Sequence, residues 1–352
     1  MLLDVISSAP QYRTLLAAMA KRGWPAQMTG LGHIHKAAVA AALSETGPFL
    51  VITPDEAMAI RLCEDVNAFT GEERAFVYPA REFTFREVEG VSREYEFARL
   101  KVLSGLAQRK IQMVICSIEA LLQYTLPPKT LRENTVAICP GEEYSPKDLT
   151  ARLLHAGYER RDQVDGVCQF SLRGGILDFY PPHAPAPYRM EFWGDEIDTI
   201  STFDLDSQRR IDTVKEALIT PAREVLYPDN AWLVKRLGKA YDSLRGKQGV
   251  KAKEILLTDM EKLEAGLSLN SIDKFLPLIY PQPATLLDYL PEAGLIFCEM
   301  VSVKEASKTS MWQHYEDVSQ LLQEGVLFKG CDTFAMEFPQ VLAAMEGRPC
   351  AI

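Results

Sequence analysis

The sequence contains none of the short motifs that mark common catalytic sites. It has no G-x-S-x-G turn, no H-E-x-x-H helix and no intact G-x-x-x-x-G-K-[ST] phosphate loop. Its acidic residues fall at expected helix starts and on outer faces, so no carboxylate pair stands out as a general acid and base. We therefore expect no catalytic residue in this chain, and we interpret the chain as an interaction module in preference to an enzyme.

Clustered metal ligands are also missing. The seven cysteines and five histidines are scattered, and no two cysteines form a C-x-x-C pair. Structural zinc sites need paired ligands, so we expect no metal site. The odd number of cysteines and their apolar surroundings indicate reduced thiols, which favours a cytoplasmic protein. MLLDVISSAP lacks the basic and apolar regions of a signal peptide, and no run approaches the ~20 apolar residues of a membrane span.

Length and charge suggest several domains without a general affinity for nucleic acid. At roughly 150 residues per domain, 352 residues predict two or three domains. The formal net charge of −10 argues against a basic surface covering the whole chain. One segment, RGKQGVKAKE at 245–254, carries four cations. We interpret it as a solvated loop and the start of a helix.

Strands and helices alternate along much of the chain, which predicts an α/β fold with a parallel sheet. Ile111–Cys116 is almost continuously apolar, as expected for a strand covered on both faces. A later apolar strand at 295–298 is expected to return to the same sheet. We also expect helices at 10–22 (ended by Gly23), 35–43, 92–108 and 310–324, and strands at 49–53 and 76–78. Two further helices are expected to begin at Asp55, after Pro54, and at a Ser117 cap.

Residues 29–37 (TGLGHIHKA) lie where a nucleotide-binding domain would place its phosphate loop. Gly30 and Lys36 keep the required spacing, but His35 replaces the second glycine and Ala37 replaces the hydroxyl residue that holds magnesium. A side chain would crowd the phosphate cradle. We expect a degenerate phosphate loop that does not work.

Residues 135–220 are expected to form one compact α+β unit. The sequence predicts a helix over 146–155 and strands at 169–172, 175–180 and 189–193. In the last strand Arg189, Glu191 and Trp193 share one face because the side-chain period of a strand is two. Arg and Trp are enriched at binding hot spots, so this face suits a protein partner. A polar face that only meets water remains the alternative.

Three stretches carry a family resemblance: AREFTFREVEGVSREYEFARLKVL (80–103), GYERRDQVDGVCQFSLRGGILDFYPP (157–182) and YRMEFWGDEIDTISTFDLDSQRRID (188–212). With them, the chain resembles the N-terminal UvrB-like module of bacterial transcription-repair coupling factor (Mfd). UvrB itself fits less well. It needs an intact phosphate loop near its N-terminus, and its long DNA-gripping hairpin has no room between Phe76 and Ile111.

The resemblance implies a degenerate P-loop, RecA-like parallel-sheet domain with a small α+β domain inserted into it. Its domains would be an N-terminal helix packing with domain 1b (1–25), a motor-like domain 1a without a working phosphate loop (26–134), domain 2 (135–220), and domain 1b, truncated at its C-terminal end (221–352).

The resemblance also implies a function. Domain 2 would bind UvrA, the damage-recognition ATPase, through Arg173, Arg189 and Trp193, with Glu191 in a secondary role. The family often has Phe at the position of Trp193, and Ser171 stands where UvrB has a further Arg. In nucleotide excision repair coupled to transcription, this module would be a non-catalytic adaptor. It would hold no cofactor and no metal.

The parent protein would be an ATP-dependent DNA translocase that displaces stalled RNA polymerase. ATP, magnesium, DNA and the polymerase would bind its C-terminal parts, on which this module could fold back. The alternative is a UvrB-type ATP-dependent repair enzyme that uses an atypical phosphate loop at Gly30 and Lys36.

Overall fold

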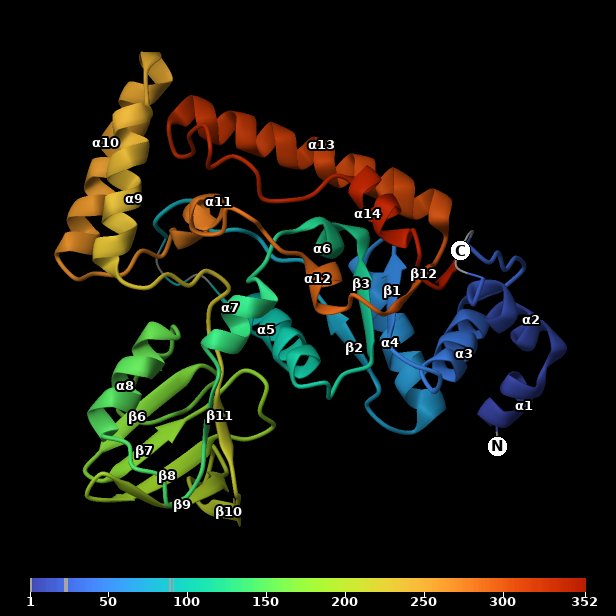
Figure 1. Cartoon of the computed structure of the whole chain (residues 1–352), viewed down its shortest axis with the longest axis horizontal. Coiled ribbons are helices and arrows are strands. Elements are labelled where there is room, and N and C mark those ends of the chain that lie inside the picture. Colours follow the sequence, from blue (N-terminus) through green and yellow to red (C-terminus); the bar gives the residue numbers. More distant parts are fainter. Residues whose placement is uncertain (1, 22–24, 89, 91) are drawn as a thin grey trace. The chain divides into compact units, whose positions relative to one another are not determined.

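The computed structural model describes residues 2–21, 25–88, 90 and 92–352, which form two compact units (Figure 1). Unit 1 consists of Met1–Ser92, Arg109–Thr125 and Tyr227–Ile352. Unit 2 consists of Arg93–Gln108 and Leu126–Leu226. In the described residues, no helix has the length and apolar character needed to cross a membrane.

A five-stranded parallel sheet forms the centre of unit 1, as the alternation of strands and helices predicts. Its strand order is β13-β12-β1-β3-β2. All residues of β1 and β3 are buried, because helices cover both faces of a parallel sheet. The predicted return of the strand near 295 is confirmed, since it pairs with β1. The strands are β1 (Phe49–Thr53), β2 (Ala75–Tyr78), β3 (Met113–Ser117), β12 (Gly294–Phe297) and β13 (Cys350–Ala351).

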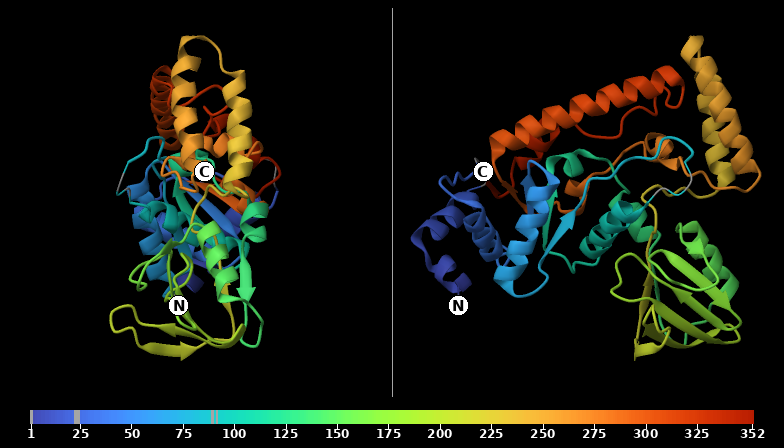
Figure 2. Two further views of the ribbon diagram at one scale, coloured as in Figure 1. Left: turned by 90° about the vertical axis from the view of Figure 1, so that its left-hand side faces the viewer. Right: turned by 180° about the vertical axis from the view of Figure 1, so that it is seen from behind.

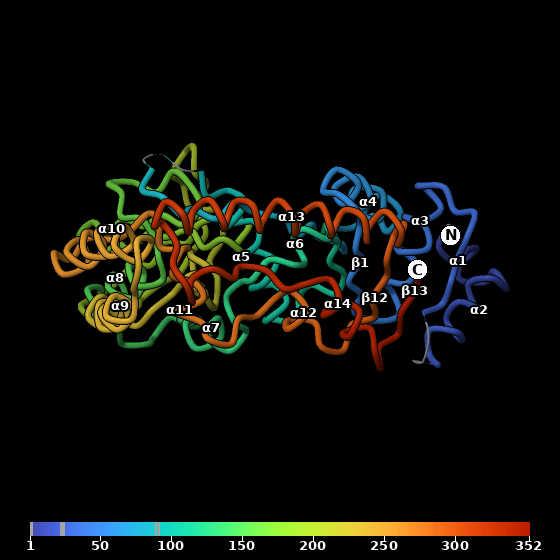
Figure 3. Tube along the Cα trace, turned by 90° about the horizontal axis from the view of Figure 1, so that it is seen from above, coloured from blue at the N-terminus to red at the C-terminus, as the bar shows by residue number. Residues whose placement is uncertain are grey.

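Helices that start at predicted caps cover this sheet. The Asp55 carboxylate accepts the backbone N–H of Met58 at 2.7 Å and begins α4, and the Ser117 hydroxyl caps α6. Seen from above, α13 runs along the middle part of unit 1, with contacts to α6 and α10 (Figure 3). The helices of unit 1 are α1 (Leu2–Ser8), α2 (Pro10–Met19), α3 (His33–Leu43), α4 (Glu56–Thr70), α6 (Ile118–Leu122), α9 (Asn230–Ser243), α10 (Gly246–Glu264), a 3-10 helix (Ile272–Phe275), α11 (Leu276–Ile279), α12 (Leu286–Tyr289), α13 (Met300–Glu324) and α14 (Phe338–Met345).

Two expectations about unit 1 need adjustment. The N-terminal helix is a pair, α1 and α2, and its buried side chains join a core shared with α3, α4 and β1, in addition to a contact of α2 with β13. The expected stop at Gly23 lies outside the described residues. The segment 245–254 was expected to be a loop and the start of a helix; α10 does start there, but it begins at Gly246 and leaves only Arg245 outside the helix.

Unit 2 contains a six-stranded sheet in the order β10-β9-β8-β7-β6-β5, antiparallel except for β5 and β6. A two-stranded sheet of β11 and β4 accompanies it. The elements are α5 (Glu94–Ala107), α7 (Pro128–Glu133), β4 (Val136–Ile138), α8 (Pro146–His155), β5 (Glu159–Arg160), β6 (Gln169–Arg173), β7 (Ile176–Phe179), β8 (Tyr188–Trp193), β9 (Glu196–Phe203), β10 (Arg210–Thr213) and β11 (Ala217–Ile219).

The compact units do not follow the expected boundary between residues 134 and 135, because α5 and α7 group with unit 2. A buried ion pair explains the position of α5. Arg99 and Glu224 are both fully buried, with Nε to Oε1 at 2.7 Å and Nη2 to Oε2 at 3.2 Å. Arg93 also donates to the carbonyl of Ala222 at 2.8 Å. Separating these partners would leave charges buried without compensation.

Candidate protein-docking site

The large sheet of unit 2 has one apolar and one polar face. Successive side chains of a strand point to opposite faces, so Met190 is buried while Arg189 and Glu191 are only partly covered. The apolar face packs with α8 in a core that includes Leu149, Leu153, Phe170, Leu177, Phe179, Met190 and Ile200. We call five residues of the polar face the docking patch: Arg173, Ile176, Arg189, Glu191 and Trp193.

Arg189 is the most firmly held residue of the docking patch. Its Nε lies 2.7 Å from Oδ1 of Asp178, and its Nη2 lies 2.9 Å from Oδ2. Its guanidinium stacks 4.5 Å from the ring centroid of Phe203, and Nη1 donates to the carbonyl of Gln208 at 3.0 Å. The hydrogen bond to Asp178 raises the pKa of Arg189. Its orientation is therefore fixed from three sides.

Arg173 binds the same carboxylate from the neighbouring strand. Its Nη2 lies 2.8 Å from Oδ2 of Asp178, and its side chain is 48% exposed. The two arginines therefore lie together, which the strand pattern alone could not establish. The Asp178 carboxylate is fully buried and supplies one negative charge against two positive ones. This cluster of three side chains keeps a net positive charge beside a solvent-exposed guanidinium.

Trp193 supplies a large apolar surface at the end of β8. Its side chain is 84% exposed, although tryptophan is highly buried on average in folded proteins. Ile176, which pairs with Glu191 across β7 and β8, is 36% exposed. The arginines of the docking patch thus lie on β6 and β8, and its exposed apolar side chains lie on β7 and β8.

Glu191 is engaged within the unit. It forms an ion pair with Arg210 of β10, and Thr199 donates to its Oε2 at 3.4 Å. Its charge is therefore compensated before any partner binds, which suits the secondary role that the sequence assigns to it.

The sequence-based site omitted Asp178, Ile176 and Arg210. Asp178 left a signal, because it is an acid within the apolar run ILDFY, and a buried carboxylate needs a partner. The other two depend on strand pairing. Nothing in the local sequence of Arg210 indicates that it faces Glu191.

The residues that the sequence predicts to be a degenerate phosphate loop lie before and in the first turn of α3. Gly30 adopts a positive φ of 79°, and Nδ1 of His35 accepts the backbone N–H of Gly32 at 3.3 Å. Lys36 forms an ion pair with Glu299. The ammonium group of Lys36, which would have to bind a phosphate, is therefore already paired with the Glu299 carboxylate. That this loop does not bind a nucleotide stays a prediction.

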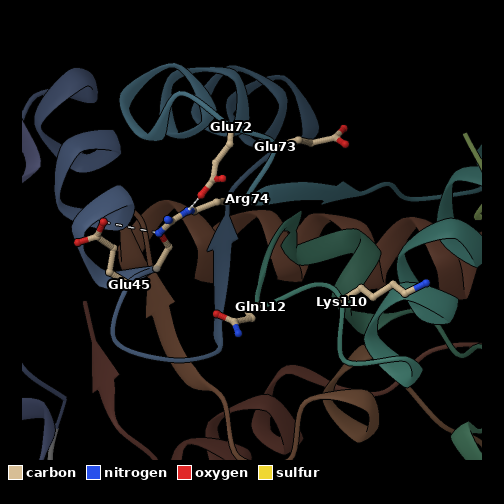
Figure 4. Close-up of a pocket in the computed structure, with 7 residues that line it drawn as sticks. Glu45, Glu72, Glu73, Arg74, Lys110 and Gln112 are labelled. Atoms are coloured by element: carbon tan, nitrogen blue, oxygen red, sulfur yellow. Dashed lines mark hydrogen bonds and ion pairs between the residues drawn. The ribbon is translucent and has the colours of Figure 1, made fainter.

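A separate cavity of about 510 Å³ lies at the opposite edge of the unit 1 sheet (Figure 4). Glu45 precedes β1, Arg74 precedes β2 and Gln112 precedes β3, so the cavity is at the amino ends of the strands. Ligands of parallel sheets bind at the carboxyl ends. Arg74 is already paired with Glu72 and Glu45. Among the described residues, no three His, Cys, Asp or Glu side chains are grouped to hold a metal ion.

Comparison with known families identifies the part of the chain that carries the docking patch. Residues 136–225 match the family described as the UvrB interaction domain. This range runs from β4 past β11 and includes every docking-patch residue. It leaves out α5, whose Arg99 is buried against Glu224 inside the matched range.

Most of the chain is similar to transcription-repair-coupling factors. The identity is 30% over 286 residues to that of Bacillus subtilis, covering 79% of this chain and 24% of the relative. It is 28% over 299 residues to that of Haemophilus influenzae (84% and 25%), and 26% over 312 residues to that of Staphylococcus haemolyticus (86% and 27%). The chain is therefore similar to the transcription-repair-coupling factors over about a quarter of their length, and its residues 136–225 match the UvrB interaction domain.

Proposed function

We propose that unit 2 recruits UvrA through the docking patch, and that the chain is a non-catalytic adaptor in transcription-coupled nucleotide excision repair. The observation that carries the proposal is the shared carboxylate: Arg173 and Arg189 converge on Asp178 within the matched domain. The similarity to transcription-repair-coupling factors supports the repair context.

The docking patch offers a partner two kinds of contact. Arg173 has five N–H donors and is half exposed, so it can bind acidic or carbonyl groups of a partner. Trp193 can insert into an apolar pocket, and a tryptophan beside an arginine is a typical hot-spot pair. Because Asp178 already holds both arginines in place, little side-chain entropy would be lost on binding.

Affinity for UvrA tests the proposal directly. We expect Arg173→Ala and Trp193→Ala each to weaken binding by about 2 kcal/mol or more, roughly a 30-fold rise in Kd, measured by biolayer interferometry with immobilised UvrA. Arg189→Ala should do at least as much, but it also leaves Asp178 with one partner fewer, so its unfolding must be measured in parallel.

Matched controls exist on both units. Trp312 on α13 is 63% exposed, and Arg161 in unit 2 is an exposed arginine paired with Glu159. Trp312→Ala and Arg161→Ala should leave the Kd unchanged. If all three docking-patch variants bind UvrA like the wild type, the proposal is wrong.

For the whole protein, we propose an ATP-dependent DNA translocase that displaces stalled RNA polymerase and acts in the cytoplasm. ATP, magnesium, the polymerase and the DNA on which the motor acts would bind outside this chain, and the module could also contact the C-terminal region of its parent. The support is the coupling of transcription and repair in the names of the relatives. The ion pair of Lys36 with Glu299 weighs against the alternative, a UvrB-type ATPase.

A further inference from the structure

The hairpin of α9 and α10 concentrates positive charge in an acidic chain. Residues 235–253 contain seven lysines or arginines and one acid, Asp242, for a formal charge of +6, whereas the whole chain carries −10. α9 ends at Ser243 and α10 begins at Gly246, so these residues lie on the two helix segments that lead to and from the turn between them; Figures 1 and 2 show this turn at one end of the hairpin. We call this end of the hairpin the basic tip.

Most of this charge is not neutralised within unit 1. Five of these cations are exposed: Lys235, Lys239, Arg245, Lys247 and Lys251. None of the five forms an ion pair with another described residue. Arg245 donates to the carbonyl of Leu244 at 2.8 Å, and Lys251 to that of Gln323 at 3.3 Å. A neutral carbonyl does not cancel the charge. Glu324, the acid that Lys251 influences, is already paired with Arg86.

The remaining two cations are held by aromatic rings. The guanidinium of Arg236 lies 4.2 Å from the ring of Trp232 and donates to the carbonyl of Leu278 at 2.7 Å. The ammonium of Lys253 lies 4.6 Å from the ring of Tyr241. Both aromatic side chains are therefore occupied within the hairpin.

The spacing of the lysines in the basic tip destabilises the two helices that carry them. Lys235 and Lys239 are one turn apart on α9, and Lys247 and Lys251 are one turn apart on α10. Like charges at this spacing repel and destabilise a helix. The first turn of α10 also has no acidic residue to offset them. Conflicts with local stability are expected where a sequence serves a function.

We propose that the basic tip binds the phosphate backbone of duplex nucleic acid. On α9, residues 235–243 span about 12 Å at ~1.5 Å per residue, and a duplex presents one phosphate charge per ~1.7 Å of its axis. A duplex can therefore offer a phosphate to each exposed cation. Because lysine acts as a point charge, the binding is independent of sequence.

Other polyanions fit the basic tip less well. Single strands bind by stacking bases on exposed aromatic rings, and protein partners favour aromatic anchors, but Trp232 and Tyr241 are already stacked by cations. Val250 is exposed, but valine is under-represented among hot spots. The basic tip belongs to unit 1, outside residues 136–225, so this inference does not rest on the proposed binding of UvrA.

Fluorescence anisotropy with a labelled duplex of about 20 base pairs, measured with the full chain from about 50 mM salt upward, tests the proposal. A variant with glutamine at all five positions (K235Q, K239Q, R245Q, K247Q and K251Q) should bind at least about tenfold more weakly. The magnitude of the slope of log K against log salt should fall by up to about 4.5, because each of the five lost phosphate contacts contributes about 0.9. The double variants K235Q/K239Q and K247Q/K251Q should each lose part of the affinity.

A control with the same change in net charge separates a site from a general effect. K110Q, K147Q, R152Q, K304Q and K329Q together remove five exposed cations outside the hairpin, and this variant should bind like the wild type. Equal weakening of both variants, or no duplex binding by the wild type at about 50 mM salt, would overturn the proposal. So would a preference for single strands, or displacement of the duplex by polyglutamate of equal charge.

Discussion

At the scale of single residues, the exposed docking patch depends on a carboxylate that no partner can reach. The Asp178 side chain is fully buried and receives bonds from Arg173 and from two nitrogens of Arg189. Because both guanidiniums bind the same carboxylate, their positions are fixed, and the N–H groups that do not bind Asp178 can make other contacts. Asp178 therefore acts as a positioning residue, and its contribution shows first in stability.

Asp178→Asn is expected to lower the free energy of unfolding by about 3 kcal/mol, because a neutral amide leaves the mostly buried Arg189 without its counter-charge. Urea unfolding measures the loss. Asp198→Asn, at an exposed position of the same sheet, should change stability by less than about 0.5 kcal/mol. Equal stability of the two variants would show that Asp178 does not hold the arginines.

At the scale of elements, sequence patterns predicted the strands that carry the site but not the whole sheet. β6, β7 and β8 were predicted within one or two residues, although only β8 has the alternation of apolar and polar residues that identifies a strand. β9 was not predicted. Its pairing with β8 shifts register between Glu191 and Phe192, and its buried Ile197 and Ile200 are three residues apart. That spacing is not the period of two that identifies a strand.

The helices that were misjudged have equally local reasons. α10 contains Gly246 and Gly249 near its start, and glycine disfavours helix interiors, so the segment resembled a loop. Gly249 packs closely against the preceding turn, since a Cβ there would lie 3.2 Å from the carbonyl carbon of Leu244. α13 begins at Met300, ten residues before the predicted start. Its N-cap residue, Glu299, adopts a positive φ and makes no capping hydrogen bond, so the sequence has no helix-start signal at this position. Only tertiary contacts reveal either feature.

The end of α13 offers a test of how closely this helix packs against α10. Gly325 has a φ of 82°, and a Cβ there would lie 2.7 Å from Cβ of Lys251 and 2.8 Å from the nitrogen of Ala252. Gly71, at the end of α4, has a φ of 74° and open space around it. Gly71→Ala should cost about 1 kcal/mol from backbone strain alone. Gly325→Ala should cost at least about twice as much by urea unfolding; equal losses would mean that the α10 contact is loose.

At the scale of the whole molecule, the two units interleave along the sequence. The chain leaves unit 1 after Ser92, contributes α5 to unit 2, returns for residues 109–125 and enters unit 2 again at Leu126. Sequence patterns could identify α5 as a helix, but its membership depends on Glu224, 125 residues further on. Local composition therefore does not reveal which unit this helix joins.

The Arg99–Glu224 pair predicts which part of the molecule unfolds when it is broken. In Arg99→Ala, the fully buried Glu224 loses its counter-charge, which should cost about 3–5 kcal/mol. Hydrogen exchange should accelerate across residues 126–226, while β1, β3 and β12, whose core belongs to unit 1, should keep their protection. The double variant Arg99→Met, Glu224→Leu should recover most of the loss, because apolar side chains of similar volume can replace a buried ion pair. If exchange accelerated equally in both units, α5 would be part of a single cooperative core, and the two units would not be separate folding units.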